Sequence, residues 1–151
     1  MTPTEIKSQF YKKTNSSKIK VEENGKQAVF LNPNRSAYFV IRVDGHLIKN
    51  KVACDFVVSK EEFADLMIEL KGMDVDHAVE QVLSTAKFWH DTALREGKIA
   101  ALVVSSRYPR FDSKVARYKE KFARQFKGPL HLVTKNQEYC MERVVEFNGP
   151  L

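Results

Sequence analysis

The stretch that decides the fold is residues 54–72, CDFVVSKEEFADLMIELKG. Two short apolar runs lie on either side of a charged connection at 59–63. Runs of this length joined by a short polar segment predict two adjacent buried strands. Asp55 begins the first run, and Glu69 and Lys71 end the second, although buried strands favour apolar and β-branched residues. Three ionisable residues at the ends of buried strands therefore require a chemical explanation.

The composition of the whole chain limits the class of protein. The chain has 151 residues, of which 43% are hydrophobic and 29% charged, as in a globular domain with a sizeable core. No stretch approaches the roughly 20 apolar residues of a membrane span, and no signal peptide is recognisable. Cys54 and Cys140 form no metal or redox motif, so a reduced, cytoplasmic protein without membrane association is expected. The net charge of +6 permits a polyanionic partner.

The segment before this stretch is expected to contribute a short helix, a linker and strands. Thr2 and Glu5 match a capping box with proline at the first helical position, which predicts a helix to about Lys13. A polar segment rich in lysine and serine follows at 14–20, so residues 1–25 are expected to form an N-terminal helix and linker. The strands expected from there to the end of the decisive stretch are 26–31, 37–43, 47–58 with a bend near Lys49 and Asn50, and 64–71.

The segment after this stretch predicts two helices and further strands. Apolar residues recur at spacings of three and four from Val75 to Leu94, which predicts a long helix that ends at Gly97. The nearly continuous apolar run 99–105 is typical of a central strand buried on both faces. A second helix, a core strand, and an edge strand or short helix are expected at 112–126, 130–134 and 139–147. The fold class expected is α/β, a single-domain mixed β-sheet with helices on both faces.

The alternation of side chains along a strand brings the ionisable residues together. Glu69 and Lys71 share one face and are about 7 Å apart along the strand. If the two strands of the stretch form a hairpin, Asp55 reaches the same end of the sheet as Glu69. Two converging carboxylates repel each other unless a cation lies between them or one is protonated. Oxygen ligands favour Mg²⁺ or Mn²⁺ over zinc, and Lys71 beside such an ion would orient or activate a water, or stabilise charge on a phosphate.

Asp55, thirteen intervening residues and the triplet Glu69-Leu70-Lys71 at a strand end resemble the motif of the PD-(D/E)xK nuclease superfamily. The resemblance covers the order of elements over roughly residues 37–105. It implies a single nuclease-like domain over residues 1–151, with an α-β-β-β-α-β core and here an additional αβ unit at the C-terminus. It also implies Asp55 and Glu69 as Mg²⁺ ligands, Lys71 as the residue that assists the attacking water, and cleavage of phosphodiester bonds in DNA.

Several branches of this superfamily place a glutamine on the following helix, facing the site. Gln81 has this position, on the polar side of the predicted helix with His77 and Thr85. A polar helix face is the alternative explanation for Gln81, and an exposed sheet edge with a Glu–Lys contact is the alternative for Asp55, Glu69 and Lys71. The sequence thus leaves a catalytic and a purely structural interpretation open.

Context separates the central triplet from two other Glu-x-Lys triplets, at 5–7 and 96–98, which lie at a predicted helix start and helix stop. The chain departs from the family motif at Cys54, where proline is common. Family members often carry a further acidic residue, and the sequence leaves several candidates open. These are Glu5, Glu22, Glu23 and Asp44.

Two functions from different classes are compatible with the sequence. The first is a metal-dependent nuclease acting on DNA, with RNA as an alternative substrate. A basic stripe on the helix 112–126 would then contact phosphates, or else it is a solvated face; its residues are Lys114, Arg117, Lys121 and Arg124. The second is a catalytically inactive nuclease-like binding module, such as an immunity protein, antitoxin or regulatory subunit. Because the chain has no room for a separate sequence-reading domain, the nuclease would recognise DNA shape or ends, form a homodimer, or act as a subunit of a larger system. The binding module would act through a protein partner.

Overall fold

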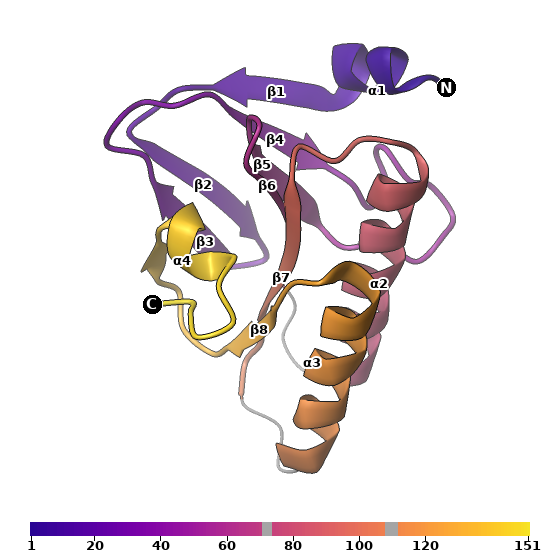
Figure 1. The fold of residues 1–151 in the computed structure, drawn as a ribbon, viewed down its shortest axis with the longest axis vertical. Coiled ribbons are helices and arrows are strands. Elements are labelled where there is room, and N and C mark those ends of the chain that lie inside the picture. The colour runs from indigo at the N-terminus through magenta and orange to yellow at the C-terminus, as the bar shows by residue number, and fades with distance from the viewer. Residues whose placement is uncertain (71–73, 108–111) are drawn as a thin grey trace.

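Alternating and continuous apolar runs form two sheets in the computed structural model, which describes residues 1–70, 74–107 and 112–151 (Figure 1). The six-stranded sheet has the order β1-β4-β5-β6-β7-β8, and the three-stranded sheet has the order β2-β3-β9. The expected α/β class with a mixed sheet is confirmed. In chain order the elements are α1 (Pro3–Phe10), β1 (Tyr11–Thr14), β2 (Lys18–Glu23), β3 (Lys26–Leu31), β4 (Tyr38–Arg42), β5 (Phe56–Lys60), β6 (Ala64–Glu69), α2 (Val75–Asp91), β7 (Lys98–Val104), α3 (Asp112–Phe126), β8 (Leu130–Val133), β9 (Glu138–Tyr139) and α4 (Met141–Val144).

The six-stranded sheet combines an antiparallel meander with a parallel half. β4, β5 and β6 pair antiparallel in sequence, and β1 adds to β4 at the edge. The chain then crosses through α2 so that β7 lies parallel to β6, and through α3 so that β8 lies parallel to β7. Parallel neighbours require such helical crossovers. The C-terminal end of β6 and the start of α2 therefore lie at the same end of the strands.

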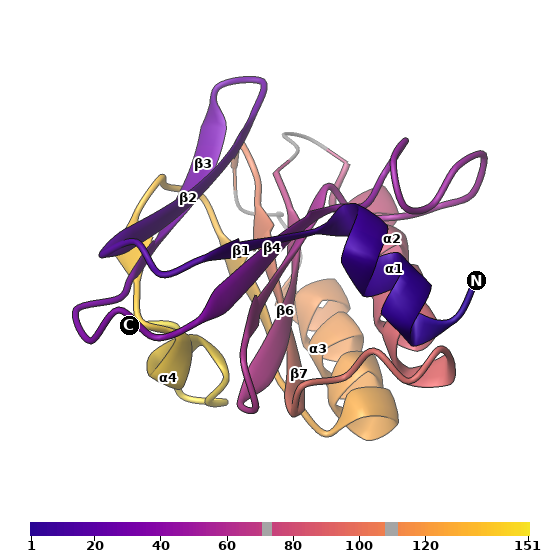
Figure 2. The same cartoon turned by 90° about the horizontal axis from the view of Figure 1, so that it is seen from above.

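Each face of this sheet is covered by a different layer (Figures 1 and 2). On one face α2 and α3 bury Val57 and Met67 of the sheet beneath Trp89 and Phe122, and α1 adds Ile6. On the other face the β2-β3-β9 sheet and the short helix α4 cover a second apolar layer. This layer includes Phe56, Leu66, Phe30 and Tyr139. Helices thus lie on both faces as expected, but the second face is covered mainly by a sheet that the sequence analysis did not predict.

The segment expected to be a linker is instead part of both sheets. α1 ends at Phe10 rather than about Lys13, and β1 follows directly. β2 alternates exposed lysine and glutamate with buried Ile19 and Val21, so its charged residues concealed a half-buried strand. The strand 26–31 exists as expected but belongs to the second sheet, because it pairs with β2 and β9.

Two element boundaries differ from the sequence prediction for local reasons. The strand expected over 47–58 begins only at Phe56, because the chain before it turns, with Asn50 at a φ of 60°. α2 ends at Asp91 rather than near Gly97, and Ala93 takes the left-handed conformation beyond it. Gly97 is required elsewhere, because a Cβ there would collide with the carbonyl oxygen of Phe63. The segment 139–147 contains both alternatives that were expected, the end of β9 and the helix α4.

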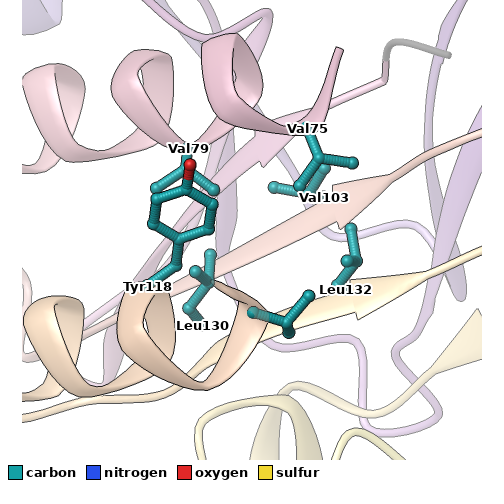
Figure 3. Close-up of a pocket in the computed structure, with 7 residues that line it drawn as sticks. Val75, Val79, Val103, Tyr118, Leu130 and Leu132 are labelled. Carbon is teal, nitrogen blue, oxygen red and sulfur yellow. The ribbon is translucent and has the colours of Figure 1, made fainter. Parts of the chain in front are cut away.

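The packing of α2 and α3 on the sheet leaves a small gap. This apolar cavity has a volume of about 10 Å³. Figure 3 shows three of the residues that bound it, Val79 of α2, Tyr118 of α3 and Val103 of β7. A volume near that of one water probe without polar lining stays dry, so this gap is a packing defect rather than a ligand site. None of the described helices is long and apolar enough to cross a membrane.

Candidate functional site

Asp55 and Glu69 meet where β5 begins and β6 ends. The two strands pair with Phe56 opposite Ile68, so one further step of the same register places Asp55 opposite Glu69. Side chains directly opposite in an antiparallel pair lie on one face with their Cβ atoms about 5 Å apart. The structure therefore brings together the two carboxylates that the sequence analysis selected.

Backbone hydrogen bonds fix the orientation of both carboxylates. The N–H of Asp55 donates to Oε1 of Glu69 at 3.0 Å, and the N–H of Leu70 donates to Oδ2 of Asp55 at 2.8 Å. Each carboxylate is thus held by the backbone of the opposite strand. These two hydrogen bonds extend the pairing of β5 and β6 by one step, with carboxylate oxygens as the acceptors. They hold the two acids at a fixed separation.

Burial of the pair is uneven. Glu69 has an exposed fraction of 0%, whereas Asp55 is half-buried. Two acidic side chains in one place, one of them fully buried, are stabilised by positive charge at the same point, from a lysine or a bound cation. Lys71, the residue expected to supply such a charge, lies outside the described residues, as do the two residues that follow it.

Helix α2 holds the segment that leads into Asp55. Nε2 of Gln81 donates to the carbonyl oxygen of Ala53 at 3.0 Å, and Oγ1 of Thr85 accepts from the N–H of Cys54 at 3.0 Å. Oγ of Ser84 donates to the carbonyl oxygen of Val52 at 2.9 Å. Residues three and four apart lie on one face of a helix, so a single polar face of α2 fixes three successive residues before Asp55.

A second polar atom of Gln81, its Oε1, is buried. The side chain is 3% exposed, and its Oε1 has no hydrogen-bond partner within the described parts of the chain. Gln81 lines a surface depression of about 430 Å³ that adjoins the segment before Asp55. The other lining residues are Asp44, Asn50, Lys51, Val52, Ala53 and His77. The depression is thus bounded by a glutamine whose Nε2 is bonded to the backbone and whose Oε1 is buried.

The four candidates for an additional acid are placed differently. Glu5 completes the capping box with Thr2, as its sequence context predicted, and Thr2 holds the pKa of Glu5 below its usual value. Glu22 lies 3.2 Å from the ammonium of Lys20, and Glu23 lies 4.0 Å from the guanidinium of Arg42.

Asp44 alone of these candidates lies beside the segment that leads into Asp55. Its N–H donates to the carbonyl oxygen of Cys54 at 3.1 Å, and the residue lines the depression beside Gln81. Among residues 1–70, 74–107 and 112–151, however, no group of three His, Cys, Asp or Glu side chains is arranged to hold a metal ion. The carboxylate donors that the structure brings together are therefore the pair Asp55 and Glu69.

The basic stripe expected on α3 is partly neutralised by neighbouring acids. Lys114 forms an ion pair with Asp76 of α2 at 2.8 Å, and Arg124 pairs with Glu120 of its own helix at 2.8 Å. Lys114 and the hydroxyl of Tyr118 together lower the pKa of Asp76. Arg117 and Lys121 remain exposed on the same helix. The stripe should therefore attract phosphates less strongly than its four basic residues suggest.

Comparison of the chain with protein-family models, with curated proteins and with solved structures finds no match. Functional inference therefore depends on the chemistry of the residues themselves. The chain presents two carboxylates fixed at adjacent strand ends, a polar helix face that holds the approach to them, and an adjoining depression. This set of groups can bind a hard divalent cation and position a polar substrate beside it.

Proposed function

We propose that the chain is a metal-dependent nuclease that hydrolyses phosphodiester bonds in DNA. The observation that carries the proposal is the pairing of Asp55 and Glu69 at the adjoining ends of β5 and β6. The order of elements gives further support. The meander β4-β5-β6, α2 and the parallel strand β7 follow the β-β-β-α-β order expected from the PD-(D/E)xK resemblance, whereas β1, β2 and β3 intervene between α1 and β4.

The donor set fits magnesium or manganese. Mg²⁺ in nucleotide-processing sites is commonly bound through one or two carboxylates, with water and substrate phosphate oxygens completing the shell. Asp55 and Glu69 supply two such carboxylates, and Asp55 retains exposure to solvent. When bound, the ion would lower the pKa of a water and stabilise negative charge on the phosphate.

The roles of the chain's own residues follow from their contacts. Because the N–H groups of Asp55 and Leu70 already orient the two carboxylates, little reorganisation is needed on binding. Gln81 fixes the approach to Asp55 through its hydrogen bond to the carbonyl oxygen of Ala53. Lys71, two residues after Glu69, is assigned to the attacking water from the sequence motif alone.

A cleavage assay with purified protein tests the proposal. Supercoiled and linear DNA are incubated with Mg²⁺ or Mn²⁺, and the Glu69→Gln and Lys71→Ala variants are compared with wild type. We expect each change to lower the cleavage rate at least about 100-fold, the scale for removing a group that stabilises a transition state. Glu61→Gln is the matched control, because this exposed glutamate lies in the turn between the same two strands. Cleavage that survives both site variants would contradict the proposal.

Calorimetric titration with Mn²⁺ separates this function from the alternative. The wild type should bind the ion, and Asp55→Asn should abolish the binding while the far-ultraviolet circular dichroism stays unchanged. Absence of both ion binding and cleavage in the wild type would favour an inactive nuclease-like binding module.

A further inference from the structure

A second concave surface lies between the two sheets. This groove of about 480 Å³ is bounded by β1 and β4 of the six-stranded sheet and by β2 of the three-stranded sheet. Its lining residues are Gln9, Phe10, Lys12, Lys20, Val21, Glu22, Val40, Arg42, His46 and Phe56. None of these residues lines the depression beside Gln81, so the groove is a separate feature.

The rim of the groove is predominantly basic. Lys12, Lys20, Arg42 and His46 are exposed, and Glu22 is the one acidic residue among the lining residues. Lys20 is paired with Glu22, and Arg42 has only a distant contact, 4.0 Å, with Glu23. Lys12 makes no ion pair within the described residues. A concave surface with unneutralised positive charge attracts a polyanion and retains it in a salt-dependent manner.

The floor of the groove is apolar. Its half-buried residues Phe10 and Val40 lie beside Val21 and Phe56, which are almost fully buried. The guanidinium of Arg42 lies over the Phe56 ring, 5.4 Å from its centroid. A DNA duplex keeps the faces of its bases stacked inside and presents mainly phosphates to such a surface. A single strand exposes the base faces as well, and these pack on aromatic rings and guanidinium planes. The combination of basic rim and apolar floor therefore fits a single strand better than a duplex.

The groove ends close to the candidate metal site. Phe56 directly follows Asp55 and lies opposite Arg42 in the pairing of β4 and β5. The N–H of Val43 donates to the carbonyl oxygen of Asp55 at 3.0 Å. Asp55 and Phe56 project to opposite faces of the sheet, so a strand leaving the groove must bend around the start of β5 to reach the carboxylates.

We propose that this groove binds a single strand of DNA and directs it to Asp55 and Glu69. The choice of DNA rests on the proposed function, whereas the preference for a single strand rests on the groove itself. The assigned contacts are Lys12 and Lys20 to phosphates, and the half-buried surface of Phe10 and Val40 with the guanidinium plane of Arg42 to a base.

The arrangement of β1 supplies a matched pair of variants. Lys12 lies opposite Val40 and lines the groove, whereas Lys13 lies opposite Phe39, with its ammonium 6.0 Å from the Phe39 ring on the other face of the sheet. Both lysines are exposed, and they are adjacent in the same strand. Lys12→Glu and Lys13→Glu therefore change the net charge equally, but only the first changes the groove.

Fluorescence anisotropy with a labelled DNA strand of about 15 nucleotides measures the effect. The full chain is used in EDTA, so binding is read without cleavage, and a duplex and an RNA strand of the same sequence are compared. We expect the single DNA strand to bind most tightly.

Lys12→Glu should weaken the binding of the single strand about tenfold and reduce the salt slope by about 0.7, the value for one phosphate contact on a single strand. Lys13→Glu should change affinity less than about twofold. Lys12→Ala should give an intermediate loss, and unchanged thermal midpoints should confirm that all variants fold.

Several results would overturn this inference. These are equal losses in Lys12→Glu and Lys13→Glu, a larger loss in Lys121→Glu on α3, or equal or tighter binding of the duplex or the RNA. The test is independent of catalysis. Cleavage by a wild type whose binding is insensitive to Lys12 would refute the groove and leave the nuclease proposal standing. Lys12-dependent binding by a protein that does not cleave DNA would support the groove and contradict the nuclease proposal.

Discussion

The two ends of β6 carry buried carboxylates in contrasting surroundings. Asp65, near the start of the strand, and Glu69, at its end, lie on the same face, and both have an exposed fraction of 0%. Oδ1 of Asp65 accepts a hydrogen bond from the hydroxyl of Ser59 at 2.6 Å. Oδ2 accepts from the N–H of Glu96 at 2.7 Å and from that of Gly97 at 3.4 Å. Glu69 instead lies opposite a second carboxylate, that of Asp55.

This contrast distinguishes a structural acid from a candidate catalytic acid. Asp65 fastens the β5–β6 turn region to the loop before β7 through three donors. Asp55 and Glu69 also accept from backbone N–H groups, but they place two carboxylates side by side, one buried and one half-buried, which is the arrangement that favours a cation. Burial of an acid in a strand is therefore not informative alone, whereas the identity of its neighbours is.

Replacement of Asp65 should have the largest effect on stability. Asp65→Ala removes the acceptor of one hydroxyl and two backbone N–H groups, and each buried donor left unsatisfied costs about 1–3 kcal/mol. We expect the free energy of unfolding to fall by about 3 kcal/mol in total, measured by urea denaturation. Glu69→Gln should change it by less than about 1 kcal/mol, because glutamine keeps an oxygen to accept from Asp55 N–H.

Ion binding should show the reverse ranking, with the larger loss in Glu69→Gln. Asp65→Ala, assayed at a temperature where it remains folded, should keep Mn²⁺ binding, and Glu69→Gln should lose it. Equal loss of ion binding in both variants would remove the distinction between the two ends of β6. A larger loss of stability in Glu69→Gln than in Asp65→Ala would show that the buried glutamate is the structural residue.

Local patterns predicted much of the main sheet and the pair of acids. β6, β7 and α2 came from uninterrupted or periodic apolar residues, and the meeting of Asp55 with Glu69 follows from a hairpin register. The second sheet was not predicted because its pairings are nonlocal. β3 pairs with β9, which is far away in the sequence. The lysines of β2 are typical of a loop, and only the packing of Ile19 and Val21 against the six-stranded sheet identifies β2 as a strand. The groove was not predicted for the same reason, since β1, β2 and β4 meet only in three dimensions.

The hydrogen bonds from α2 were only partly recognisable from the sequence. Gln81 was selected for its position after the motif, and Thr85 was noted on the same polar face, but Ser84 and the partners of all three were not. Those partners are backbone groups of residues 52–54, and no side-chain pattern records them. A backbone acceptor or donor far along the chain becomes visible only once the helix is docked.

Thr85→Val should produce an intermediate effect at the Asp55 end of the comparison. The change keeps the shape of the side chain but leaves the buried N–H of Cys54 without its acceptor, Oγ1 of Thr85. We expect a loss of about 1–2 kcal/mol in the free energy of unfolding, together with a lower cleavage rate because the segment before Asp55 loosens. Thr92→Val is the control, since this hydroxyl bonds within the end of α2, to the carbonyl oxygen of Phe88. Equal effects on cleavage in both variants would show that Thr85 does not position the site.

The smallest effect should appear in the pH dependence at the Asp65 end. Burial raises the pKa of Asp65 above its ordinary value of 3.8, and the hydrogen bonds from Ser59, Glu96 and Gly97 only partly oppose this. A raised pKa in the folded state means that the native protein binds more protons than the unfolded chain in the range above about pH 4. This residue's contribution to stability therefore falls as pH rises there.

The variant Asp65→Asn cannot titrate at this position and serves as the reference. The difference in unfolding free energy, wild type minus variant, should decrease as pH increases from about 4 through the folded-state pKa. Urea denaturation of both proteins at several pH values measures this difference. A difference that increases with pH would mean that the three donors outweigh burial and hold the carboxylate in its charged form.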